Sequence, residues 1–173
     1  MLPVISNATR FPDKWLPVKR ISRSANSEGG GGSRFQFKDI DNFKEALKEN
    51  NHSHAFMNAA SPGVINVFMP NKFYKDDDTY LEKLSEVMSP EYKLITDNNI
   101  HLQLDCPDLA LARHMNYKDL SDEEFLNRAE IQIEALNNAL IGIPPELVRM
   151  HICWGNYEGP HSHDISLDKI LPL

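Results

Sequence analysis

Histidine and cysteine side chains that can bind a soft metal are concentrated between residues 151 and 163. His151 and Cys153 are separated by one residue, so in an extended strand both would project from the same face. Imidazole and thiolate groups are the usual ligands of zinc. We therefore predict a metal site at His151 and Cys153, and we expect His161 and His163 to lie in the loop that follows.

The elements that position this pair follow a regular alternation. Short apolar runs at 54–59, 100–105 and 147–153 are typical of buried strands, and helical spacing of apolar residues covers 40–50, 76–99 and 121–142. A kink or two abutting helices are expected at Pro90, and Ser121 with Glu124 forms a capping box. The run at 64–69 fits either type of element. The sequence predicts an α/β fold with a parallel sheet.

The polar residues of interest follow the predicted strands. Ser61 comes after the first strand, Asp105 ends the second, and His151 and Cys153 end the third. Parallel α/β sheets bind their ligands at the carboxyl ends of the strands. We expect these four residues to gather on one rim.

Composition restricts the class of partner. The net charge is -7, and the basic residues of the first 38 positions precede an acidic body, which argues against a nucleic acid partner. No apolar run reaches the roughly 18 residues that cross a bilayer, and the two cysteines follow no disulfide framework. A cytoplasmic protein without a membrane partner is expected. Residues 1–38 are predicted to be irregular, with a glycine-rich linker at 29–33, and residues 39–173 to form the folded domain.

Three motifs in order carry a resemblance to a known family. They read NAASPG at 58–63, LQLDCPDLALARH at 102–114 and HICWGNYEGPHSHD at 151–164. Together they resemble the cobalamin-independent methionine synthase family of zinc-dependent thiol methyltransferases, and most of all its shorter single-barrel relatives, which are grouped with the coenzyme M transferases. The resemblance covers about residues 40–173.

The resemblance implies a (β/α)8 TIM barrel, of which this chain would form a part, and a methyl or alkyl transfer to a small-molecule thiol, as from 5-methyltetrahydrofolate to homocysteine. It implies zinc held by His151 and Cys153 together with a later glutamate and a second cysteine, which this sequence lacks. It gives Asp105 a catalytic and substrate-binding role, and Asn156 and Ser61 would also face the substrate. Where the family has a glutamate after the aspartate, this chain has Cys106.

Two alternatives remain open at this point. The chain could be a non-catalytic barrel fragment that assembles as a homo-oligomer or with a chain that completes the barrel, because an incomplete barrel leaves strand edges unpaired. A metal-dependent hydrolase that uses His161 and His163 is weaker, because these residues follow Gly159 and Pro160 in a loop.

Overall fold

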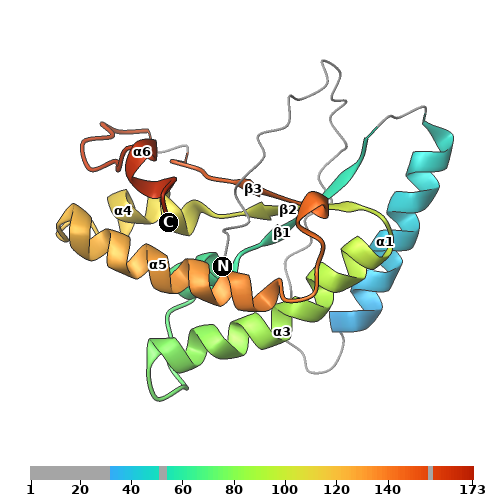
Figure 1. Ribbon diagram of the computed structural model, residues 1–173, viewed down its shortest axis with the longest axis horizontal. Coiled ribbons are helices and arrows are strands. Elements are labelled where there is room, and N and C mark those ends of the chain that lie inside the picture. Colours follow the sequence, from blue (N-terminus) through green and yellow to red (C-terminus); the bar gives the residue numbers. More distant parts are fainter. Residues whose placement is uncertain (1–31, 51–53, 156–157) are drawn as a thin grey trace. The chain divides into compact units, whose positions relative to one another are not determined.

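A small parallel sheet lies at the centre of residues 56–173 (Figure 1). The computed structural model describes residues 32–50, 54–155 and 158–173. The strands lie in the order β1-β2-β3, and both neighbouring pairs are parallel. Their bounds are Phe56–Ala60 for β1, His101–Asp105 for β2 and Val148–His151 for β3. The predicted parallel α/β arrangement is confirmed for these three strands.

Two long helices make the connections between the strands, α3 (Asp77–Asp97) and α5 (Asp122–Ala139). They pack against each other on one side of the sheet (Figure 1), and the Ser85 hydroxyl of α3 donates a hydrogen bond to the Ala135 carbonyl of α5 (2.7 Å). The shorter elements are α2 (Pro62–Phe68), η1 (Pro107–Leu109), α4 (Leu111–Met115), η2 (Pro145–Leu147) and α6 (Leu167–Ile170).

The two faces of the sheet differ in polarity. Leu102 and Leu104 alternate along β2 and are almost completely buried, as expected for the face that packs against helices. The intervening residues project to the other face, where Asn58, Gln103 and Arg149 are register partners across the three strands. The Arg149 guanidinium lies 3.6 Å from the centre of the Phe56 ring. The sheet therefore has one apolar face and one largely polar face.

Helix α3 runs through Pro90 as one element, so the expectation of two abutting helices is wrong. Asp76 caps its first turn by accepting a hydrogen bond from the Thr79 amide (2.8 Å). Leu81 is buried before the proline, and Tyr92 and Ile95 are buried after it. Proline removes one hydrogen bond from a helix interior, and apolar burial on both sides offsets that loss.

The structure also settles the type of the run at 64–69 and the start of the helix at Ser121. The run at 64–69 belongs to helix α2, which begins at Pro62 and is capped by Ser61. The capping box at the start of α5 is confirmed, because Ser121 and Glu124 each accept a hydrogen bond from the other's backbone amide. Among the helices described, none is long and apolar enough to cross a membrane.

Helix α1 (Gly32–Glu49) belongs to a separate unit, Met1–Ala55, and is described by itself. The helix predicted from residue 40 is present, but it begins at Gly32, inside the glycine-rich stretch 29–33. It ends where Asn50 donates a side-chain hydrogen bond to the Ala46 carbonyl (2.7 Å). The remainder of the segment predicted to be irregular, residues 1–31, lies outside the described residues.

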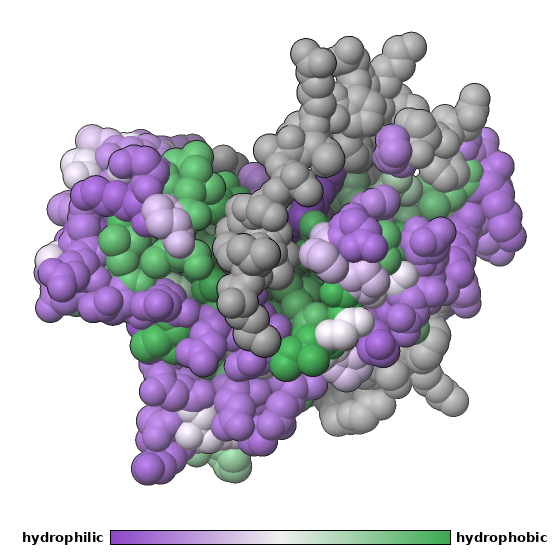
Figure 2. Space-filling view, viewed as in Figure 1, coloured by the Kyte–Doolittle hydropathy of each residue, from purple (hydrophilic) through white to green (hydrophobic). Residues whose placement is uncertain are grey.

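The C-terminal segment, residues 158–173, is held to the rest of residues 56–173 by polar contacts. Trp154 donates its indole hydrogen bond to the Ile165 carbonyl (2.9 Å), and Lys169 pairs with Asp122 at the start of α5 (2.5 Å). Hydrophilic residues cover most of the visible surface, with hydrophobic residues gathered near α6 (Figure 2). Leu167 and Leu171 are exposed there.

Replacing Tyr92 with phenylalanine is expected to lower the free energy of unfolding by about 1–2 kcal/mol. The Tyr92 hydroxyl is buried and donates a hydrogen bond to the Ala60 carbonyl at the end of β1. Its loss would leave that carbonyl without this donor. Urea unfolding measures the change, and Tyr80→Phe on the same helix is the matched control, because Tyr80 is only partly buried. Equal effects of the two substitutions would contradict the prediction.

Candidate functional site

The carboxyl ends of the three strands form one rim. Backbone hydrogen bonds between neighbouring segments continue just past the strand ends. The Ser61 amide donates to the Asp105 carbonyl (3.2 Å), and the Cys106 amide donates to the His151 carbonyl (2.9 Å). The first bond connects the residue after β1 to the end of β2, and the second connects the residue after β2 to the end of β3. The rim is thus held by the backbone itself.

Asp105 and His151 are brought together on this rim. They are register partners at the ends of β2 and β3, and the distance from His151 Nε2 to Asp105 Oδ1 is 3.9 Å. That distance exceeds hydrogen-bond range, so the two groups attract each other only when the imidazole is protonated. Both side chains are about half exposed, at 52% and 43%. A ligand at the rim can reach them.

Cys153 lies outside the strand, contrary to the prediction that the third strand runs to residue 153. Strand β3 ends at His151, so alternation along a strand does not place Cys153 beside His151. The Cys153 carbonyl accepts a hydrogen bond from the Leu111 amide (3.0 Å), and its sulfur accepts one from the Gly155 amide (3.2 Å). The backbone at Cys153 is therefore held to the start of α4.

Gly155 allows the segment after Cys153 to lie close to α4. Its φ angle is +81°, a conformation that favours glycine. A Cβ atom there would lie 2.6 Å from Leu111 Cδ1. Glycine is required at this position by both its conformation and its surroundings.

The zinc ligand set implied by the family resemblance is incomplete here. Catalytic zinc is normally held by three protein ligands and keeps one open position. Within the ranges described, no three or more histidine, cysteine, aspartate or glutamate side chains are arranged around a common point. His151 and Cys153 alone do not fit a complete zinc centre.

Ser61 is buried under the rim. Its hydroxyl donates to Asp108 Oδ1 (2.7 Å) and accepts the Val64 amide (3.0 Å) as the cap of α2. A substrate could contact Ser61 only if this pair opened, so its substrate-binding role stays a prediction. Asn156, the other predicted substrate contact, lies outside the described residues.

A buried polar cluster of Ser61, Cys106 and Asp108 is the feature that sequence reasoning missed. Asp108 is almost completely buried, with only 2% of it exposed. Burial raises the pKa of its carboxyl to about 6, although the Ser61 hydrogen bond acts in the opposite direction. The apolar residues around Asp108 in the sequence CPDLALA were the available signal of burial.

Cys106 and Arg113 are also buried in the fold. Burial strongly raises the pKa of the Cys106 thiol, which keeps it protonated and makes it a poor metal ligand. Arg113 is buried and donates hydrogen bonds to the Tyr117 and Leu120 carbonyls (2.7 and 2.8 Å). Neither residue is available to a ligand at the rim.

The comparisons with known proteins do not add an assignment. No protein-family model matches the sequence, and neither the characterised proteins nor the solved structures contain a match.

Proposed function

We propose that this chain forms part of a methionine synthase-like barrel that transfers a methyl or alkyl group to a thiol, with His151 and Cys153 as two of the zinc ligands. The observation that carries the proposal is the meeting of Asp105 and His151 at the carboxyl ends of adjacent parallel strands. Enzymes of the parallel barrel type place their reacting groups at this edge.

The winding of the sheet also supports the barrel. The strand order β1-β2-β3 follows the sequence without reversal, and α3 and α5 lie on the same side (Figure 1). A doubly wound sheet reverses its order and places helices on both faces. Progression in one direction with helices on one side is the arrangement that a closed barrel requires.

The residues of the rim have separate roles in this proposal. Zinc would supply the means of deprotonating a substrate thiol near neutral pH. Asp105, whose carboxylate is 43% exposed, would pair with a positively charged group of the substrate. A third zinc ligand must come from outside the described residues or from another chain. Both cysteines are free thiols, which suits a reducing compartment such as the cytoplasm.

The alternative is a non-catalytic barrel fragment that assembles with a second copy or with another chain. The observation in its favour is that, within the described sheet, β1 and β3 each pair with β2 alone. Edge strands of this kind are templates for further strand pairing. Metal binding through Cys153 distinguishes the two candidates, because the transferase needs it and the non-catalytic fragment does not.

Cobalt(II) added to the purified full chain is expected to give a thiolate-to-cobalt charge-transfer absorption that Cys153→Ser abolishes and His151→Ala weakens at least tenfold in apparent affinity. Cobalt stands in for zinc and reports its sulfur ligand directly. Two protein ligands bind a metal weakly, so millimolar titration is appropriate.

Two substitutions control this experiment. Cys106→Ala removes the buried thiol, and His101→Ala removes a histidine from the opposite end of β2, and both should leave the absorption unchanged. An absorption that survives in Cys153→Ser would sink the assignment of the ligands. If the unmodified chain gives no such absorption, the non-catalytic fragment replaces the enzyme as the better account.

A further inference from the structure

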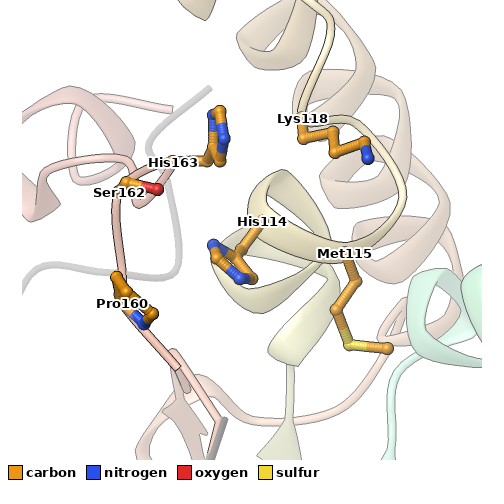
Figure 3. A pocket seen from close by; sticks show the side chains of 6 residues that line it. All are labelled: His114, Met115, Lys118, Pro160, Ser162 and His163. Atoms are coloured by element: carbon orange, nitrogen blue, oxygen red, sulfur yellow. The ribbon is translucent and has the colours of Figure 1, made fainter. Parts of the chain in front are cut away.

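Two histidines lie close to a third, His114, away from the His151–Cys153 pair. His114 lies in the last turn of α4, and His161 and His163 lie in the segment before α6. The ring centre of His114 is 5.7 Å from that of His161 and 5.8 Å from that of His163. Figure 3 shows the His114 and His163 rings on facing sides of the space between α4 and this segment.

A carboxylate already orients one of these rings. His161 Nδ1 lies 2.9 Å from Asp164 Oδ2. A hydrogen bond from one ring nitrogen to a carboxylate fixes the tautomer and directs the other nitrogen outward, which is the usual arrangement of histidines that bind metals. Asp164 thus prepares Nε2 of His161 to act as a ligand.

We propose that His114, His161 and His163 bind a divalent transition metal, with Zn²⁺ as the reference ion, and that Asp164 is a positioning residue for His161. Imidazole ligands suit zinc, copper and nickel. The proposed site uses neither His151 nor Cys153, and so it does not depend on the proposed transferase function.

The separations of the His114 ring from the other two rings are close to those that a shared metal requires. With Zn–N bonds of about 2.0–2.1 Å and tetrahedral angles, two imidazole centres on one zinc lie about 5 Å apart. The observed distances of 5.7 and 5.8 Å exceed this by less than 1 Å. Since no ligand set in the described part of the chain already converges, metal binding requires the rings to rotate. His161 and His163 are exposed, and exposed side chains change rotamer quickly. His161 must rotate while its Nδ1 stays near Asp164.

The surroundings leave room for a further ligand on the metal. A cavity of about 350 Å³ adjoins the cluster and is lined by His114, Met115, Lys118, Pro160, Ser162 and His163 (Figure 3). Lys118 is the one lining group that opposes a cation, and it is an exposed, flexible side chain that can turn toward solvent. Three imidazoles with an open fourth position would leave the metal accessible to water or a small anion.

Isothermal titration of the full chain with Zn²⁺ tests this site, and Cys153→Ser serves as the starting protein so that the rim thiol contributes nothing. One zinc per chain is expected. His161→Ala and His163→Ala should each weaken binding at least tenfold, as should His114→Ala, while Asp164→Asn should weaken it about tenfold by releasing the His161 ring.

The controls separate this site from the rim and from adventitious binding. His101→Ala should leave the affinity unchanged, and the Cys153→Ser starting protein already lacks the rim thiol. The proposal is overturned if His161→Ala and His163→Ala bind zinc as the starting protein does, or if His101→Ala loses binding to the same extent. Because His161 and His163 are exposed, their replacement tests the site even if His114→Ala disturbs folding. Failure of the zinc titration would not affect the cobalt result at Cys153, and failure of the cobalt experiment would not affect the zinc result at the three histidines.

Discussion

Replacing Gly63 with alanine is expected to destabilise the protein by about 3 kcal/mol, the combined effect of overpacking and a disturbed charged hydrogen bond. A Cβ atom at Gly63 would lie 2.1 Å from Asp108 Oδ2, 2.8 Å from Asp108 Cγ and 3.1 Å from Gln132 Cβ. The carboxylate has little freedom to withdraw, because it is buried and holds the Ser61 hydroxyl at 2.7 Å. A loss of stability would be informative, since replacing glycine with alanine normally stabilises a helix by up to about 1 kcal/mol.

A double-mutant cycle with Asp108→Ala isolates the cause. Removing the carboxylate opens the space that the new methyl group needs, so Gly63→Ala should cost less than about 1 kcal/mol in that background. Urea unfolding of the four proteins at one pH gives both values. If Gly63→Ala were equally costly with and without Asp108, the close contact between Gly63 and the carboxylate would not be its cause.

This contact shows which parts of the fold a sequence can predict. The strands ending at Asp105 and His151 could be located because short apolar runs and the spacing between them are local patterns, and Ser121 with Glu124 is a local signal for a helix start. Parallel connection then places the strand ends on one rim. The approach of Asp108 to Gly63 joins residues 45 positions apart in the chain, and no local pattern encodes it.

The errors have the same origin. Pro90 disfavours a continuous helix locally, but burial of Tyr92 and Leu81 on the two sides of it decides the outcome. The third strand was expected to reach Cys153, but β3 ends at His151, and the backbone beyond it is hydrogen-bonded to Leu111 at the start of α4. In both cases contacts between distant segments act against a local preference, so the rim could be predicted from the sequence, but the continuity of α3 and the end of β3 could not.

The second large effect is a dependence of stability on pH that comes from Asp108. Burial raises the pKa of this carboxyl from its usual 3.8 to about 6. Below pH 3.8 both the folded and the unfolded chain hold the proton. Between pH 3.8 and 6 the folded chain keeps it while the unfolded chain loses it, so the contribution to stability falls as the pH rises through this window. One pKa unit corresponds to about 1.4 kcal/mol, and the total change is therefore about 3 kcal/mol.

Asp108→Asn is expected to remove this dependence, because the amide oxygen can still accept the Ser61 hydrogen bond and carries no titrating proton. Urea unfolding of both proteins from pH 4 to pH 7.5 should show the variant gaining stability relative to the unmodified chain, by up to about 3 kcal/mol at the upper end. Subtracting the two profiles cancels the other titrating groups, including the nearby Asp105 carboxylate, which also favours the protonated form of Asp108. Profiles that run parallel over the whole range would mean that Asp108 titrates alike in the folded and unfolded chain, and the buried Ser61–Asp108 pair would then stabilise the rim equally at every pH.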